Sequence, residues 1–278
     1  MGNHYTPKKY LRRFVCNEGG IWLHDRKLLL SRLTTVQAVG NEVGLYSPTV
    51  ESNLNIQVEG PTHPIFDKIA RREHLTRGER QALAKYIVVM YKRVPIARDR
   101  SMERVPKMAN ALHDSFMMEI TQLGSTDPTF QAEEAIRNVT AAIEKVRQSP
   151  SPKLWYEGIN LIDEGPAERS LLSMNWVFLH SEKLQFLTSD NPVFFFEHEG
   201  IDSPTSELTF PISSSVALWA TRKSEQDGLH AIAIPAVIKQ INRRTAHGCN
   251  RFIFSRENEP WIMPFIKKGE WELVRMGR

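Results

Sequence analysis

The chain lacks several features that would assign it to a cellular compartment other than the cytoplasm. Its only two cysteines, Cys16 and Cys249, are too few for a disulfide scaffold and suit a reducing environment. Its longest apolar runs, "YIVVMY" and "VFFF", are far too short to span a bilayer, and the N-terminus has no apolar stretch typical of a signal peptide. We therefore expect a cytoplasmic protein without a membrane partner.

The motifs of several enzyme classes are also missing. The sequence has no glycine-rich phosphate loop, no GxGxxG after a strand, no HExxH, no GxSxG and no paired CxxC. We therefore do not expect an NTPase, a dinucleotide-binding enzyme, a zinc protease or an α/β-hydrolase.

Positive charge, by contrast, is concentrated in one part of the chain. Residues 68–107 contain twelve Lys or Arg and four Asp or Glu, whereas the whole chain has a formal net charge of only +4. Such a segment attracts nucleic acid if its charges share one face, because binding releases counterions from the polyanion. The alternative is a solvated helical surface with no partner.

The spacing of apolar residues predicts helices in the middle of the chain. Between residues 65 and 148 they recur at intervals of three and four, with breaks expected at Pro95 and Pro106. We expect a Gly-Pro turn after Glu59. The last of these helices is expected to start at residues 127–128, and its narrow apolar seam suits packing against a helix of the same chain or of another copy, so a homo-oligomer is one possibility.

The rest of the chain is rich in the residue types that are typical of β-strands. The segment "GGIWLHDRKLLLSRL" predicts an edge hairpin, "MNWVFLHS" and "LQFLTSD" predict a second hairpin, and one helix is expected from Pro235 to Gly248. The Ser-Pro stretch at residues 149–152 is the best internal boundary. The prediction is an α+β fold in a single domain of residues 1–278. Segments 1–64 and 149–278 form a mixed or antiparallel sheet, and a helical subdomain of residues 65–148 is inserted between them.

The first candidate site residue is His4, in the stretch "NHYTPKKYLRRF". A histidine there can serve as a general acid or base, as a metal ligand or merely as a polar cap on the sheet. Arg12 and Arg13 follow closely, and guanidinium groups suit the binding of phosphate by paired hydrogen bonds. This stretch predicts a site for an anionic group.

Two polar residues, Asp190 and Asn191, interrupt the apolar stretch "FLTSDNPVFFF". A partly desolvated carboxylate at a strand end can act as a base or bind a divalent cation. The alternative is an Asx turn, in which either side chain bonds its own backbone.

Three further residues complete the candidate set. Glu59 follows apolar residues, as Asp190 does, and these two carboxylates with His4 would suffice for a Mg²⁺ or Mn²⁺ site. Arg93 is a candidate phosphate ligand. Asn242 is expected to face inward from a helix, where the alternative is a core amide with both its polar atoms bonded.

Several of these motifs resemble, in the same order, a bacterial family known as domain of unknown function 4238. They are "NHYTPKKYLRRF", "VEGP", "YKRVP", "FLTSDNPV", "TFPIS", "INRRTA" and "RFIFS". The resemblance implies no activity, but it implies one continuous domain and a grouping of the polar motifs into one site. The positions it nominates are His4, Tyr5, Pro7, Arg12, Glu59, Arg93, Asp190, Asn191 and Asn242.

The function predicted from these residues is hydrolysis of phosphodiester bonds by a nuclease acting on RNA or DNA, with Mg²⁺ or Mn²⁺ as the candidate cofactor. The competing hypothesis is a non-catalytic module that binds nucleic acid or a small anionic ligand. The catalytic set is His4, Glu59, Asp190 and Asn191, the metal ligands are Glu59 and Asp190, and the phosphate or nucleic-acid ligands are Arg12, Arg13, Arg93 and Asn242. The prediction requires His4 and Asp190 to share one pocket.

Overall fold

The computed structural model describes residues 2–149, 151, 155, 159, 165–223 and 226–277. Its contacts divide the chain into two compact units, Met1–Val94 with Ile162–Arg278, and Pro95–Leu161. Helices and mixed or antiparallel sheets both contribute, which confirms the α+β class. Most of the expected boundary at residues 149–152 lies outside the described residues.

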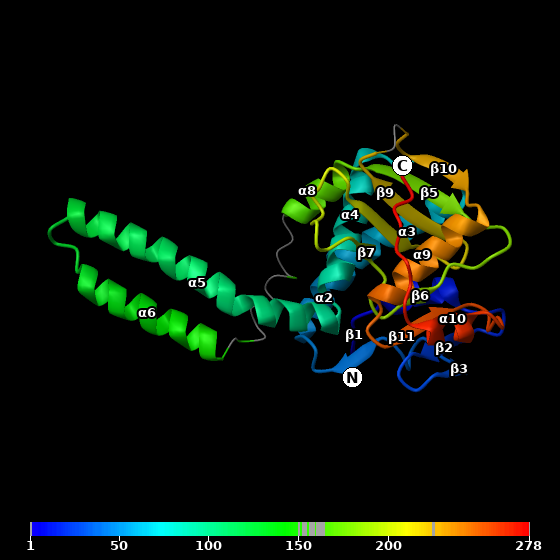
Figure 1. The fold of residues 1–278 in the computed structure, drawn as a ribbon, viewed down its shortest axis with the longest axis horizontal. Coiled ribbons are helices and arrows are strands. Elements are labelled where there is room, and N and C mark those ends of the chain that lie inside the picture. Colours follow the sequence, from blue (N-terminus) through cyan, green and yellow to red (C-terminus); the bar gives the residue numbers. More distant parts are fainter. Residues whose placement is uncertain are drawn as a thin grey trace. The chain divides into compact units, whose positions relative to one another are not determined.

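The strands of the first unit form three sheets within the described residues (Figure 1). The five-stranded sheet has the order β10 (Leu229–Ile232), β5 (Asn175–His180), β9 (Val216–Thr221), β8 (Glu207–Pro211) and β7 (Phe194–Phe195). The four-stranded sheet has the order β3 (Leu30–Thr34), β2 (Ile21–Asp25), β11 (Phe252–Ser255) and β6 (Thr188–Ser189). A two-stranded sheet pairs β1 (Gly2–His4) with β4 (Asn41–Val43). The pairing of β10 with β5 is parallel, and the other pairs are antiparallel.

The first predicted hairpin is confirmed. β2 and β3 pair in antiparallel register, and β3 lies at the edge of its sheet. Asp25 fixes the turn, because its Oδ1 accepts hydrogen bonds from the backbone N–H groups of Lys27 and Leu28 at 2.9 and 3.0 Å.

The second predicted hairpin is wrong, because β5 and β6 belong to different sheets. The chain between them is held by distant partners. Phe186 N–H donates to the carbonyl of Ser214 at 2.8 Å, and Leu187 N–H donates to Oδ1 of Asn242 at 2.9 Å. These non-local bonds direct the segment from one sheet to the other.

The expected turn after Glu59 is also wrong, since the chain is helical from α2 (Pro48–Leu54) through a π-helical segment (Asn55–Glu59) to α3 (Gly60–Ala70). Pro61 lies in the first turn of α3, where a missing N–H costs little. A π-helical turn inserts an extra residue into a helix and is common at functional sites. Glu59 therefore sits in a helical context and does not end a strand.

α4 (Arg77–Lys92) follows the expected pattern. It begins with a capping box between Thr76 and Glu79. Its apolar face is buried, as the spacing predicted, by Leu83, Tyr86, Ile87 and Met90. α3 packs against α4, and α4 packs against α8 (Pro166–Leu172). Because of this packing, both helices before Pro95 belong to the first unit, and the compact helical unit begins at Pro95 instead of residue 65.

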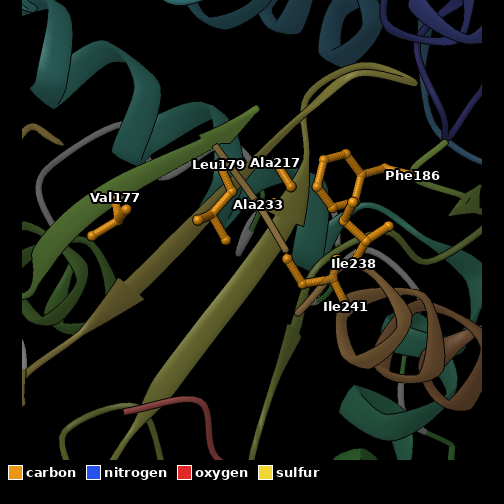
Figure 2. Close-up of a cluster of buried hydrophobic side chains, with 7 residues drawn as sticks. All are labelled: Val177, Leu179, Phe186, Ala217, Ala233, Ile238 and Ile241. Carbon is orange, nitrogen blue, oxygen red and sulfur yellow. The ribbon is translucent and has the colours of Figure 1, made fainter. Parts of the chain in front are cut away.

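The core of the first unit lies between the five-stranded sheet and α9 (Pro235–Gly248), a helix with the bounds that the sequence predicted. Figure 2 shows side chains from β5 and β9 meeting those of α9. The cluster consists of Val177, Leu179, Phe186, Ala217, Ala233, Ile238 and Ile241. The unit also contains α1 (Lys8–Leu11), the 3₁₀ helix Arg12–Phe14 and α10 (Ile262–Lys268).

The second unit contains α5 (Pro95–Thr126) and α6 (Ala132–Gln148), which pack side by side as a helical hairpin (Figure 1). The predicted break at Pro106 is wrong, because one missing N–H is tolerated within a helix of 32 residues. The predicted start at residues 127–128 is also wrong: Asp127 accepts hydrogen bonds from the backbone and hydroxyl of Thr129 in the turn before α6. The expected helix-to-helix packing is confirmed within the chain. None of the helices in the described residues has both the length and the apolar character needed to span a membrane.

Candidate active site

Arg93, at the C-terminal cap of α4, is the most deeply buried residue of the site, with 1% of its surface exposed. Its Nη1 donates to Oε1 of Glu59 at 2.6 Å, and its Nη2 donates to the Tyr46 hydroxyl at 2.7 Å and to the backbone carbonyl of His4 at 2.5 Å. Burial acts to lower the pKa of Arg93, but Tyr46 and Glu59 outweigh it and raise that pKa. The guanidinium therefore stays charged, and its donors hold β1 and the π-helical segment together.

The π-helical segment brings Glu59 to Arg93. The Glu59 side chain is about nine-tenths buried, and a buried ion pair is maintained only where the geometry compensates the lost hydration. Tyr46 extends the arrangement, because its hydroxyl donates to the carbonyl of His4 at 2.8 Å.

His4 is half-buried at the end of β1, where it pairs with Asn41. Burial lowers the pKa of His4, and Lys8 and Arg93 add to this, while a backbone hydrogen bond with Gln37 and the charge of Glu59 oppose it. Among the described residues, no group bonds its buried Nε2 atom. The lowered pKa favours the neutral form of His4, and its buried Nε2 is left unbonded by the described residues.

His63, on α3, is a second imidazole that the sequence reasoning missed. Its Nε2 is also buried and has no hydrogen-bond partner in the described part of the chain. Burial lowers the pKa of His63, with Lys9 and Arg13 acting in the same direction and Glu59 and Asp67 opposing them. The signal was the spacing: in a helix, residues 59 and 63 are neighbours on one face. The turn expected after Glu59 concealed it.

A third polar atom near Glu59 has no hydrogen-bond partner in the part of the chain that the structure describes. The hydroxyl of Tyr86 is buried without a hydrogen-bond partner among the described residues, and burial followed by the charge of Glu59 raises its pKa. Buried polar atoms normally have partners, so these three atoms, each within reach of the charge of Glu59, can bond to an ordered water or to a ligand.

Cations act on both imidazoles: Lys8 and Arg93 on His4, and Lys9 and Arg13 on His63. Lys8, Lys9 and Arg12 are exposed. Arg13 is more constrained, because its Nη2 forms an ion pair with Asp67 at 2.7 Å and its guanidinium lies 4.9 Å from the centre of the Phe66 ring. The exposed cations can meet an anionic ligand arriving from solvent.

Asp190 has different surroundings at the end of β6. Its Oδ1 accepts from the backbone N–H of Asn250 at 2.8 Å, and its Oδ2 accepts from those of Arg251 and Phe252 at 2.8 and 2.9 Å. Burial raises the pKa of Asp190, and these bonds act in the opposite direction. The carboxylate therefore fastens β6 to the start of β11, whereas an Asx turn would have bonded its own loop.

The two predicted amides are bonded to backbone as well. Asn191 donates from Nδ2 to the carbonyl of Gly248 at 2.8 Å, and its buried Oδ1 has no partner among the described residues. Asn242 accepts from Leu187 N–H and donates from Nδ2 to the carbonyl of Gln185 at 3.0 Å, as the alternative of a satisfied core amide predicts. A cavity of about 260 Å³ lies beside Asn242, and its lining is mainly apolar.

The predicted residues thus form two groups. His4, Glu59 and Arg93 come together, and Asp190, Asn191 and Asn242 bond to backbone elsewhere in the same unit. Tyr5, next to His4 in the sequence, lies close enough to Asp190 that the charge of Asp190 adds to burial in raising the pKa of Tyr5. The described hydrogen bonds of the Asp190 carboxylate come from backbone and do not include His4.

The two predicted metal ligands have other partners in the structure, and the metal site stays a prediction. Glu59 is paired with Arg93, and Asp190 is occupied by backbone N–H groups. The described residues contain no group of three or more His, Cys, Asp or Glu side chains that could hold a metal.

The family model described as protein of unknown function DUF4238 matches residues 3–259. The chain belongs to this family. The match confirms the resemblance seen in the motifs. No match to the chain was found among curated proteins or among solved structures.

The geometry of this DUF4238 chain defines what the site can do chemically. Two imidazoles whose buried Nε2 atoms are unbonded among the described residues can take up and release protons if a substrate reaches them. Exposed Lys8 and Lys9 add positive charge near them, which suits a substrate carrying phosphate.

Proposed function

We propose that the protein cleaves phosphodiester bonds in RNA, with His4 and His63 as the proton-transfer pair. The observation that carries the proposal is that both imidazoles interact with Glu59 and that the buried Nε2 of each has no partner among the described residues. Neither Glu59 nor Asp190 has to bind a metal ion in this reaction.

The chemistry follows from the available nitrogens. One imidazole accepts the proton of the ribose 2′-hydroxyl, and the resulting oxygen attacks phosphorus. The bond to the 5′ oxygen breaks, and the other imidazole, in its protonated form, donates its proton to that leaving oxygen. The products are a 2′,3′-cyclic phosphate and a free 5′-hydroxyl. DNA lacks the 2′-hydroxyl and should not react by this route.

The lowered pKa values of His4 and His63 suit the imidazole that acts as the base. A neutral imidazole accepts a proton, and burial keeps His4 and His63 neutral. A phosphate bound near them raises the pKa of both, because a neighbouring negative charge favours the protonated form. Substrate binding therefore supplies the acid.

The exposed cations favour a polyanionic substrate. Lys8, Lys9 and Arg12 lie within one short segment, and each can contact a separate phosphate of a single strand. Arg93 has another role, because its bonds to Glu59 and to the carbonyl of His4 position the first imidazole.

The test compares labelled RNA with DNA of the same sequence, each in EDTA and in Mg²⁺ or Mn²⁺. We expect RNA to be cleaved in EDTA to a cyclic phosphate and DNA to remain intact. His4→Gln and His63→Gln should each reduce the rate by about 10²- to 10⁴-fold. His4→Gln retains the backbone carbonyl that Arg93 and Tyr46 bind, so the variant should fold.

The matched control is His198→Gln, since the His198 side chain is 74% exposed and pairs with Glu199. Its rate should equal that of the wild type. Cleavage that requires Mg²⁺ or Mn²⁺, or equal cleavage of DNA, would contradict the proposal.

A second candidate function is binding of an anionic ligand without cleavage. The observation that favours it is the ion pair of Arg93 with Glu59, which makes the site rigid and leaves the exposed cations of residues 8–12 to bind. RNA binding that weakens with salt, with no product in any buffer, would support this function and refute cleavage.

A further inference from the structure

The helical hairpin of α5 and α6 exposes an apolar stripe on α5 that one exposed acid, Glu119, interrupts. Met108, Leu112, Phe116 and Leu123 on α5 are 61%, 50%, 40% and 49% exposed. At 100° per residue these four side chains lie within an arc of about 80°, along about 22 Å of the helix. We call this set the α5 stripe. It overlaps the edge of the face of α5 that carries the buried residues, because Val105 lies at the same angle as Leu123 while Ala109 and Ile120 lie just beyond Phe116.

The charges of the hairpin are divided along its length. His113 Nε2 lies 3.4 Å from the hydroxyl of Thr140, so these residues mark its middle. The tip half, residues 114–139, carries five acids (Asp114, Glu119, Asp127, Glu133 and Glu134) and one cation, Arg137. The base half, residues 103–113 and 140–148, carries four cations (Arg104, Lys107, Lys145 and Arg147) and two acids, Glu103 and Glu144.

We infer that two copies of the chain associate through their α5 stripes in antiparallel orientation, so that the two hairpins form a four-helix bundle. An antiparallel arrangement places the acidic tip of each hairpin beside the basic base of the other. A parallel arrangement would bring like charges together. Charge complementarity therefore selects a second copy as the occupant of the stripe and also selects its orientation.

The packing requirements of helices support the same partner. A hairpin of two helices cannot enclose an apolar core, and Ile143 is the one α6 residue that is fully buried among those described. Two hairpins related by a two-fold axis provide four helices and bury the same stripe twice. Phe116 lies near the centre of the α5 stripe and so near this axis.

The first experiment measures the oligomeric state of the full chain by analytical ultracentrifugation at low and high salt. We expect a dimer that weakens as salt rises. Leu112→Lys combined with Phe116→Lys should raise the dissociation constant at least about 100-fold. Both side chains are exposed in one copy, so the fold should survive, and circular dichroism checks this.

The matched control is Met118→Lys. Met118 is 70% exposed on the same helix but points away from the α5 stripe. This variant should dimerise like the wild type. A monomeric wild-type chain, or a dimer that tolerates both stripe substitutions, would overturn the inference.

Charge reversal tests the complementarity. A tip variant, Glu133→Lys with Glu134→Lys, and a base variant, Lys145→Glu with Arg147→Glu, should each dimerise more weakly than the wild type. A chain carrying all four changes should regain the dimer. Failure of the four-fold variant to recover would refute the electrostatic part of the inference.

Cross-linking tests the orientation. Phe116→Cys should form a disulfide between copies, because the two-fold axis brings residue 116 close to its equivalent. Met108→Cys should cross-link only to Leu123→Cys of a second chain, whereas a parallel dimer would join two Met108→Cys chains. The native Cys16 and Cys249 are buried and should not interfere.

Discussion

Two regions of the first unit contain carboxylates in similar sequence contexts and use them differently. The Glu59 cluster comprises His4, Tyr46, Glu59, His63 and Arg93. The Asp190 loop comprises Asp190, Asn191 and the backbone of residues 248–252. In the Glu59 cluster the carboxylate pairs with a side chain, and two imidazole nitrogens nearby lack partners in the described residues. In the Asp190 loop the carboxylate oxygens accept backbone N–H groups.

The difference indicates separate roles. A carboxylate that accepts three backbone hydrogen bonds fixes a loop and has little capacity left for a substrate. A cluster with several unpartnered polar atoms can still bind one, and among the described side chains the Glu59 cluster and its surroundings have at least three such atoms, whereas the Asp190 loop has one, Oδ1 of Asn191. The Glu59 cluster is therefore the better candidate for chemistry, and the Asp190 loop is the better candidate for structural support.

The substitution with the largest expected effect is Arg93→Met, which removes the cation from the Glu59 cluster. Glu59 would remain buried without its partner, and the free energy of unfolding should fall by about 3–5 kcal/mol. Urea unfolding followed by circular dichroism measures this.

The control adds Glu59→Gln to Arg93→Met, so that no uncompensated charge remains. This double variant should recover part of the lost stability. A loss below about 1 kcal/mol for Arg93→Met alone would show that the ion pair is not desolvated.

Asp190→Asn is expected to have a smaller effect on stability. It separates the roles of the two regions more sharply, because it should affect stability and not cleavage. The amide keeps one acceptor oxygen and turns an NH₂ group toward backbone N–H donors, so stability should fall by about 3 kcal/mol. RNA cleavage per folded molecule should not change. The control is Asp202→Asn, whose side chain is exposed, with an expected change within about 0.5 kcal/mol. If Asp190→Asn abolished cleavage and left stability intact, the roles assigned to the two regions would be reversed.

Much of the fold could be predicted because its signals are local. The hairpin of β2 and β3 and the helix α9 have their apolar spacing and their end residues within a few positions of each other. Pro106 misled the prediction, because proline propensity is a local signal and the packing of α5 against α6 overrides it.

The candidate site could be predicted only in part. Its residue types were visible at His4, Glu59 and Arg93, but their partners depend on contacts across up to 89 positions of the chain. The bonds of Asp190 reach residues 250–252, which no local pattern indicates. His63 was missed because the prolines on either side of it suggested a turn, and the helix that places it beside Glu59 became evident only from the structure.

The substitution with the smallest expected effect is His24→Gln. His24 lies in the same sheet as β6, so it extends the comparison of the two regions from carboxylates to imidazoles. His24 is fully buried, and its Nδ1 and Nε2 lie 2.8 Å from the hydroxyls of Ser31 and Ser255. Burial lowers the pKa of His24 to about 4 from 6.5. The unfolded chain therefore binds a proton first as the pH falls, so the stability from neutral His24 is full above pH 6.5 and is lost towards pH 4.

In His24→Gln, the fall in unfolding free energy between these pH values should be smaller than in the wild type by about 2 kcal/mol. Urea unfolding at several pH values measures it, with exposed His198→Gln as the control. An unchanged pH dependence in His24→Gln would show that His24 has the same pKa in the folded and the unfolded chain, which would contradict the lowered pKa.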